Sequence, residues 1–231
     1  RLTCACRLGR LDEVVALLQS GADVNQRNDY GTSPLWFACQ GNHPEVVSTL
    51  LSAGATIEFT ALNLASRRGH TDTVSILLSA GADVDYADAG GFTPLFLACQ
   101  AGHRDMASML LLAGADVNYA SRHGLTPLMF ACVEGHLNIV QALSSFGATR
   151  HPKARRVATD RGHHDVVAWL DSSSQWSTPL HHLSVIGADR ARALLRGGAD
   201  LHASADAAGP TPLSLALALR AAGNAADGSA A

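Results

Sequence analysis

The sequence lacks the features that mark membrane proteins and nucleic-acid-binding proteins. No apolar run approaches the ~20 residues of a membrane span, and no secretory signal leads the chain. The formal net charge is only −3, so no strong field attracts nucleic acid or an anionic membrane. We therefore expect neither kind of partner. The chain begins at Arg1 without a methionine, from which we expect a fragment or a processed chain.

Catalytic motifs are also missing. The sequence contains no H-E-x-x-H, no Walker loop, no G-x-G-x-x-G and no recognisable Ser/His/Asp arrangement. Its paired glycines, such as Gly90-Gly91, fit turns, where glycine adopts positive φ without steric cost. We therefore expect no enzyme, and no catalytic, cofactor-binding or metal-binding residues.

The sequence does contain a repeat with a period of 33 residues. Thr60, Thr93 and Thr126 follow one another at that spacing, and Gly114 and Gly147 are separated by the same interval. In the unit from residue 88 to 120, Thr93 suits a helix N-cap and Pro94 the first helical position. The motif T-P-L returns at 93–95, 126–128, 178–180 and 211–213, and Gly-Ala-Asp returns at 21, 81, 114 and 198.

This pattern resembles the ankyrin repeat family, whose unit has about 33 residues, a T-P-L-H-x-A motif, two helices and a turn. The resemblance covers nearly the whole chain. It implies an all-α solenoid of helix-turn-helix units with short β-turn fingers, in which each unit buries its apolar face on its neighbours. A module of this kind binds protein partners, so we expect a protein–protein interaction module.

The spacing also predicts how the repeats are distributed. We expect six repeats over 1–171, one and a half divergent repeats over 172–220, and a flexible tail over 221–231. The third and sixth repeats have shortened fingers, because the chain reaches Thr60 and Lys153 only six residues after Gly54 and Gly147.

The cysteines and histidines follow the repeat and do not form a metal cluster. Four of the five cysteines occupy one repeat position, which places them roughly 10 Å apart along the stack. That is too far for a disulfide or a shared zinc ion. Small buried thiols indicate a reducing compartment, the cytoplasm or the nucleus. Five histidines lie in the turns between helices, one per repeat, and we expect them to be structural: His43, His70, His103, His136 and His163.

The partner-binding residues follow from the resemblance. Ankyrin repeats contact partners through the concave face, by way of finger tips and the exposed ends of the first helices. Tyr30, Phe92 and Leu125 stand out because an apolar tip is costly to expose unless a partner covers it. Carried onto this sequence, the predicted partner-binding residues are Arg27, Asp29, Tyr30, Gln40, Arg67, Arg68, Phe92, Gln100, Arg122, His123, Leu125 and Glu134.

A sharper hypothesis concerns the shortened finger at 55–59. Its loss leaves Arg67 and Arg68 unshielded at the end of a first helix, where two guanidinium groups can bind carboxylate or phosphate. We therefore expect an acidic or phosphorylated segment of the partner to bind at the gap left by the shortened finger, with Tyr30 and Phe92 as apolar walls. The alternative is that both arginines are merely solvated.

Two other functions stay open at this point. The chain could be the substrate-recognition arm of a larger enzyme such as a ubiquitin ligase, or a purely structural segment of a longer array. No residue indicates self-association, so we expect a monomer.

Overall fold

The computed structural model describes residues 1–173, and these form helices joined by turns and loops with no β-strand among them. The chain divides into two units, the first ending at Thr126 and the second beginning at Pro127, and their described residues are considered separately. The helices are α1 (Leu2–Arg7), α2 (Leu11–Gln19), α3 (Pro34–Gly41), α4 (Pro44–Ser52), α5 (Phe59–Arg68), α6 (Thr71–Ser79), α7 (Pro94–Ala101), α8 (Arg104–Leu112), α9 (Pro127–Glu134), α10 (Leu137–Ser145), α11 (Pro152–Asp160) and α12 (His164–Ser172).

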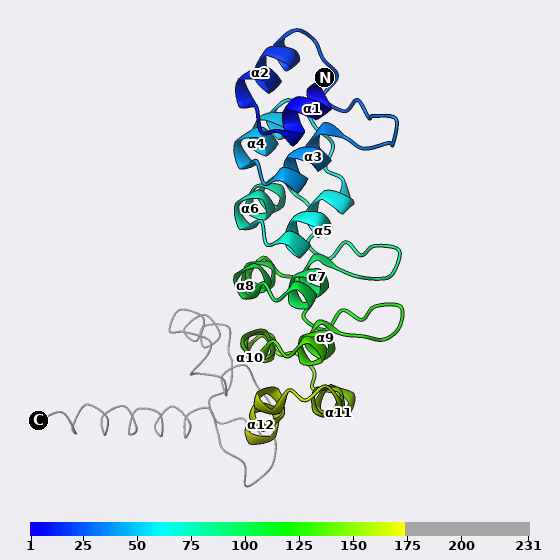
Figure 1. Cartoon of the computed structure of the whole chain (residues 1–231), viewed down its shortest axis with the longest axis vertical. Coiled ribbons are helices and arrows are strands. Elements are labelled where there is room, and N and C mark those ends of the chain that lie inside the picture. Colours follow the sequence, from blue (N-terminus) through cyan, green and yellow to red (C-terminus); the bar gives the residue numbers. More distant parts are fainter. Residues whose placement is uncertain (174–231) are drawn as a thin grey trace, which may run out of the picture. The chain divides into compact units, whose positions relative to one another are not determined.

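The first unit is a stack of helix pairs, as the repeat predicts (Figure 1). One layer consists of α1, α3, α5 and α7, which pack on one another in that order; we call these the inner helices. The second layer consists of α2, α4, α6 and α8, the outer helices, which also pack in order. Each inner helix packs on the outer helix that follows it in the chain. The all-α solenoid fold class predicted from the sequence is confirmed.

Local chemistry explains where the regular inner helices begin and end. The hydroxyls of Ser33 and Thr93 accept hydrogen bonds from the N–H groups of Trp36 and Phe96, at 3.1 and 3.3 Å. Each cap satisfies a backbone donor that the first helical turn leaves without a partner. Asn42, at the end of α3, adopts the left-handed conformation with φ of 55°, and Gly102 takes the equivalent position after α7.

The core of the first unit lies between the two layers. Leu35 and Leu95 on the inner helices, and Leu50 and Leu110 on the outer helices, have at most 1% of their surface exposed. Ala98, which holds the alanine position of the T-P-L-H-x-A motif, is fully buried. A small residue at this position allows the inner helices to approach closely. The layers are therefore held together by a continuous apolar seam, repeated once per helix pair.

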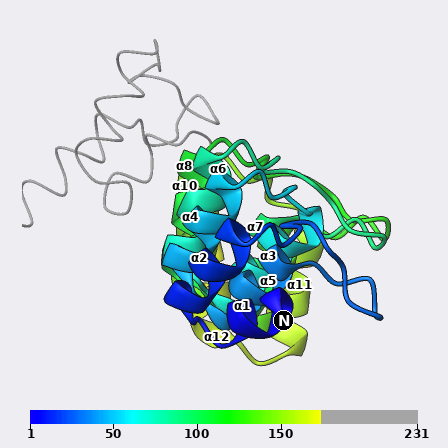
Figure 2. The same cartoon turned by 90° about the horizontal axis from the view of Figure 1, so that it is seen from above.

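Three loops project from the inner helices as fingers: the first finger (residues 22–32), the second (82–92) and the third (115–125) (Figures 1 and 2). Each closes through a tight turn; in the second, the N–H of Asp88 donates to the Phe92 carbonyl and the N–H of Gly91 to the Asp88 carbonyl. The second and third fingers are also bonded to each other, from the Arg122 N–H to the Gly90 carbonyl at 3.2 Å.

Between α4 and α5 the chain has no finger, and the short link runs directly from Gly54 to Phe59. The helix begins two residues earlier than the repeat pattern predicts, at Phe59 and not at Ala61. Thr60 is therefore not an N-cap but an exposed residue of the first turn, and Glu58 holds the cap position without a capping side-chain bond. The physical reason is local: no proline follows Thr60 to fix the start of the helix.

In the second unit, α9 packs on α10 and α11 packs on α12, which gives two helix pairs. The pairs stack on each other through α9 on α11 and α10 on α12. The link before α11 is short, and the His151 ring nitrogen Nδ1 caps that helix by accepting from the Lys153 N–H. Arg155 stands at a motif position where the other first helices carry leucine. It is exposed and pairs with Asp171 of α12, with Nε to Oδ1 at 2.5 Å and Nη2 to Oδ2 at 2.8 Å. This guanidinium holds the pKa of Asp171 below its usual value.

The predicted divergent repeats over 172–220 and the predicted tail over 221–231 lie outside the described residues, apart from the end of α12 and Ser173. Within the described part of the chain, no helix is both long and apolar enough to cross a membrane.

Candidate partner-binding surface

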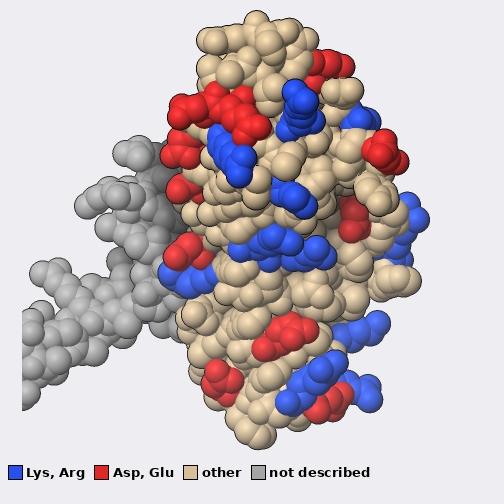
Figure 3. Space-filling view, turned by 45° about the horizontal axis from the view of Figure 1, so that its top comes forward, with Lys and Arg blue, Asp and Glu red and all other residues tan. Residues whose placement is uncertain are grey.

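The predicted binding residues divide by exposure. In the first unit, Arg27, Asp29, Tyr30, Arg67, Arg68, Gln100, Arg122 and His123 are exposed, as is Glu134 in the second unit. Gln40, Phe92 and Leu125 are half-buried. Figure 3 shows several basic side chains over the middle of the face it presents, and acidic side chains at its left margin and at other places on the same face.

The tip of the first finger presents a fully exposed aromatic ring. Tyr30 has 92% of its surface exposed, and the turn that carries it is fixed by the Asn28 side chain, which accepts from the N–H groups of Tyr30 and Thr32 at 3.0 and 2.9 Å. Arg27, beside it, forms an ion pair with Glu58 at 2.6 Å and donates to the Gly31 carbonyl. These bonds fix the conformation of the first finger, and they leave the Tyr30 ring exposed to solvent.

Phe92, by contrast, belongs partly to the core of its own repeat. Its ring centroid lies 4.6 Å from that of Phe96, and the side chain is half-buried at the base of the second finger. Of the two aromatic residues expected to form walls, only Tyr30 stands at an exposed tip.

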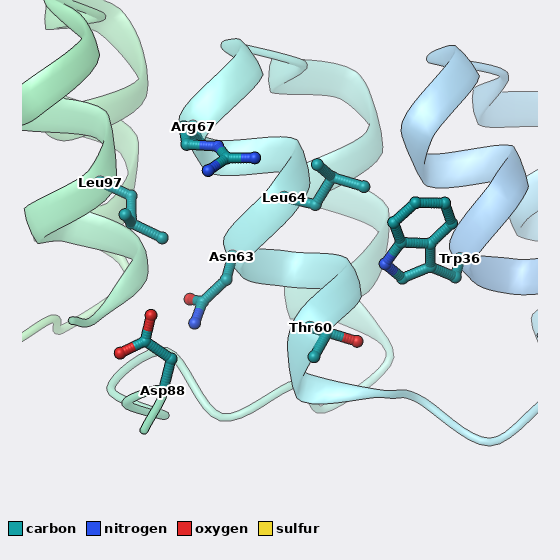
Figure 4. Close-up of a pocket in the computed structure, with 7 residues that line it drawn as sticks. All are labelled: Trp36, Thr60, Asn63, Leu64, Arg67, Asp88 and Leu97. Carbon is teal, nitrogen blue, oxygen red and sulfur yellow. The ribbon is translucent and has the colours of Figure 1, made fainter. Parts of the chain in front are cut away.

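A pocket of about 230 Å³ opens where the third repeat lacks its finger (Figure 4). It lies over α5, between α3 on one side and α7 with the second finger on the other. On α5, the lining residues follow helical spacing, which puts them on one face of the helix. The pocket is lined by Trp36, Thr60, Asn63, Leu64, Arg67, Asp88 and Leu97.

Asn63 is the polar centre of this pocket. Only 7% of its surface is exposed, and its oxygen Oδ1 is buried with no hydrogen-bond partner. Its nitrogen Nδ2 makes one long bond, to the Phe92 carbonyl at 3.4 Å. The equivalent motif positions in α3, α7 and α9 carry the large apolar residues Trp36, Phe96 and Met129. Asn63 was not identified from the sequence, although a polar residue at a position that is apolar in the other repeats indicates a candidate binding residue.

The structure separates the two arginines that the sequence places together. Arg67 lines the pocket, and among the described residues its guanidinium has no ion-pair partner. Arg68 instead turns back to the end of α3, where its Nη1 donates to the Gln40 carbonyl at 2.9 Å. One guanidinium therefore faces the pocket, while the other binds the neighbouring helix.

Arg68 also changes the environment of the turn histidine in its repeat. His43, His103 and His163 each place Nε2 near the carbonyl at the end of the preceding first helix, at 3.2, 3.1 and 2.9 Å. In the third repeat that carbonyl belongs to Gln40, and Arg68 already binds it. The Nε2 of His70 is buried without a hydrogen-bond partner. Burial lowers the pKa of His70, and the nearby positive charge of Arg68 lowers it further, against the opposing effect of the Gln40 carbonyl.

Replacing Arg68 with methionine is therefore expected to raise the pKa of His70. The substitution removes a nearby positive charge and leaves the Gln40 carbonyl for the imidazole N–H. The pKa of His70 in the folded state lies below its usual 6.5. The free energy of unfolding of the wild type therefore decreases as the pH falls below 6.5, and that of the variant should decrease less. Histidine titration by NMR measures the shift. Arg67→Met is the control, and an unchanged pKa in Arg68→Met contradicts the argument.

A second hollow, of about 360 Å³, adjoins the pocket along the base of the first finger. The two adjoin at their shared lining residues, Trp36 and Thr60, and we call them together the groove. The second hollow contains the Arg27–Glu58 ion pair, in which Glu58 is only 13% exposed. The groove therefore has a neutralised charge pair at one end and the unpaired Arg67 at the other.

The cysteines do not contribute to this surface. All five are free thiols; Cys4 is exposed, and Cys6, Cys39, Cys99 and Cys132 are buried. Burial raises the pKa of Cys6, Cys39 and Cys132 to about 12 and also raises that of Cys99, so these thiols stay protonated and unreactive. In the part of the chain that the structure describes, no three His, Cys, Asp or Glu side chains are grouped to hold a metal ion.

Comparison with known families decides the classification. Residues 62–155 match the family described as "Ankyrin repeats (3 copies)", and residues 2–51 match "Ankyrin repeats (many copies)". The chain belongs to the ankyrin repeat family. This confirms the resemblance inferred from the motifs, and ankyrin repeats are in general protein–protein interaction modules.

Similar proteins share only part of their length with this ankyrin repeat chain. Ankyrin repeat domain-containing protein 40 of Mus musculus is 43% identical over 75 residues, covering 29% of this chain and 21% of that protein. Protein fem-1 homolog C of Bos taurus is 36% identical over 58 residues, 25% of this chain and 9% of that protein. Protein phosphatase 1 regulatory subunit 27 of Homo sapiens is 38% identical over 52 residues, 22% of this chain and 34% of that protein.

Proposed function

We propose that this ankyrin repeat chain binds a protein partner through the inner helices and finger tips of its first unit. The observation that carries the proposal is Tyr30, an aromatic side chain 92% exposed at the tip of an ordered finger. Tyrosine and arginine are enriched among residues that dominate binding energy. Because the finger is already fixed by the Asn28 bonds, little conformational entropy is lost on association.

Arg122, His123 and Gln100 extend the same proposed surface. The third finger, which carries Arg122 and His123, is bonded to the second, so the two present one ordered edge. The name of one relative, a regulatory subunit of protein phosphatase 1, describes a protein that acts together with another protein. This similarity supports a regulatory or adaptor role.

Site-specific photo-cross-linking tests the proposal. A photoreactive amino acid placed at position 30 should cross-link a protein partner in cell extract, because Tyr30 lies at the proposed interface. The matched control is position 112, since Leu112 is also a large exposed apolar residue, at 68%, but lies on an outer helix. Once the cross-linked partner is purified, Tyr30→Ala should weaken its binding by about 2 kcal/mol or more. Equal cross-linking at both positions would count against a finger-based interface.

A further inference from the structure

We propose that the pocket over α5 binds an extended acidic segment of the protein partner, in which a backbone N–H donates to Asn63 and an acidic side chain pairs with Arg67. This rests on the proposed function and narrows it to one pocket and one ligand chemistry. The apolar lining residues Trp36, Leu64 and Leu97 form the surface against which a side chain of the segment packs.

Asn63 offers a hydrogen-bond acceptor that has no donor. Asn63 lines the pocket and is only 7% exposed, and its buried Oδ1 has no hydrogen-bond partner. A buried acceptor left without a donor is costly, so a ligand that supplies an N–H gains the full bond. An extended peptide provides such a donor at each residue except proline. Figure 4 shows the Asn63 amide turned toward the Asp88 side of the pocket.

The charges around the pocket favour an acidic ligand. Arg27 is neutralised by Glu58, and Arg68 is bonded to the Gln40 carbonyl, which leaves Arg67 as the unpaired cation of the groove. A guanidinium matches a carboxylate or phosphate with two parallel hydrogen bonds. Asp88 lies on the opposite side of the pocket, and its Oδ1 already accepts from the Gly90 and Phe92 N–H groups. Its charge disfavours acid at that end, so the acidic side chain is directed to Arg67.

The size and surroundings of the pocket favour an extended chain. A volume of about 230 Å³ accommodates roughly one or two residues, which is smaller than the ~300 Å³ or more of most small-molecule sites. The adjoining hollow, which shares Trp36 and Thr60, allows a chain to continue toward the first finger. A full-length finger on the third repeat would lie beside these two hollows, but the third repeat has no finger between α4 and α5. The groove therefore fits an extended segment better than a compact metabolite.

The test uses the whole chain and a library of random twelve-residue peptides displayed on phage. Selected peptides should share an acidic residue, and their affinity is measured by fluorescence polarisation. Arg67→Glu should weaken binding at least tenfold, and a peptide with lysine in place of its acidic residue should recover affinity for that variant. Arg7→Glu is the matched control, because Arg7 holds the same motif position on α1, and it should leave binding within about twofold.

A second variant, Asn63→Leu, separates binding from folding. Large apolar side chains occupy the equivalent positions at Trp36 and Phe96, so this variant should fold while losing the acceptor. We expect it to weaken the selected peptides about fivefold or more. Peptides carrying glutamate, phosphoserine or glutamine at the acidic position distinguish the carboxylate and phosphate sources, and glutamine should bind weakest.

The outcomes distinguish this inference from the proposed function. Peptides that lack an acidic residue, bind Arg67→Glu unchanged, or are never selected overturn the assignment of the pocket. Cross-linking of a partner at position 30 would then still support the proposed interface. Peptides that require Tyr30 but not Arg67 or Asn63 likewise overturn the pocket alone.

Discussion

Replacing Leu110 with alanine should lower the free energy of unfolding by about 2–5 kcal/mol, the range for removing a fully buried leucine side chain. Leu110 lies on α8 and has none of its surface exposed. The truncation removes apolar contacts and leaves a cavity between the inner and outer layers. In a stacked repeat, the same loss weakens both the repeat itself and its packing on α6.

The matched control is Leu112→Ala on the same helix. Leu112 is 68% exposed, so the change should stay within about 0.5 kcal/mol. Urea unfolding followed by circular dichroism measures both. Similar losses at the two positions would contradict the division into a buried and an exposed face of α8.

Amide hydrogen exchange should be faster in residues 148–171 than in residues 88–143, by about tenfold or more. Arg155 stands where Leu62, Leu95 and Leu128 are buried in the other first helices. Burying a leucine contributes about 1.5–3 kcal/mol, whereas the Arg155–Asp171 ion pair is exposed and screened by solvent, so it replaces little of that stabilisation. Each 1.4 kcal/mol lost in opening free energy raises exchange about tenfold.

Exchange measured by mass spectrometry on peptic fragments compares the two segments directly. Arg155→Leu provides the control, because it restores the apolar residue of the repeat and should slow exchange in 148–171. Equal protection of both segments in the wild type would show that α11 gains its stability elsewhere, for example through the Arg150 guanidinium, which lies 5.0 Å from the centre of the Trp169 ring.

Part of the candidate surface could be predicted because it repeats. The T-P-L motif places Thr93 before Pro94, and Thr93 caps α7 as that motif predicts. The repeat also places Tyr30 at a finger tip, where the structure finds it exposed. These features depend on bonds within a few residues of the chain, which is why the pattern of residue types is sufficient to predict them.

The pocket could not be predicted in the same way. Trp36, Asn63 and Leu97 belong to three different repeats, and they meet only when α3, α5 and α7 stack. The sequence hypothesis grouped Arg67 with Arg68 because they are adjacent. On a helix, however, adjacent side chains diverge by about 100°. The structure leaves Arg67 at the pocket and takes Arg68 to the Gln40 carbonyl.

By itself the sequence determined the repeat, the helix pairs of the ankyrin fold and the missing finger before α5, because each is encoded in periodic local positions. Only the tertiary structure decided which arginine remains unpaired, that Arg68 donates to the Gln40 carbonyl that also acts on His70, and that the Asn63 oxygen is buried without a donor. Those properties depend on distances between side chains of neighbouring repeats. The spacing of residues along the sequence does not determine which side chains bond to the same atom.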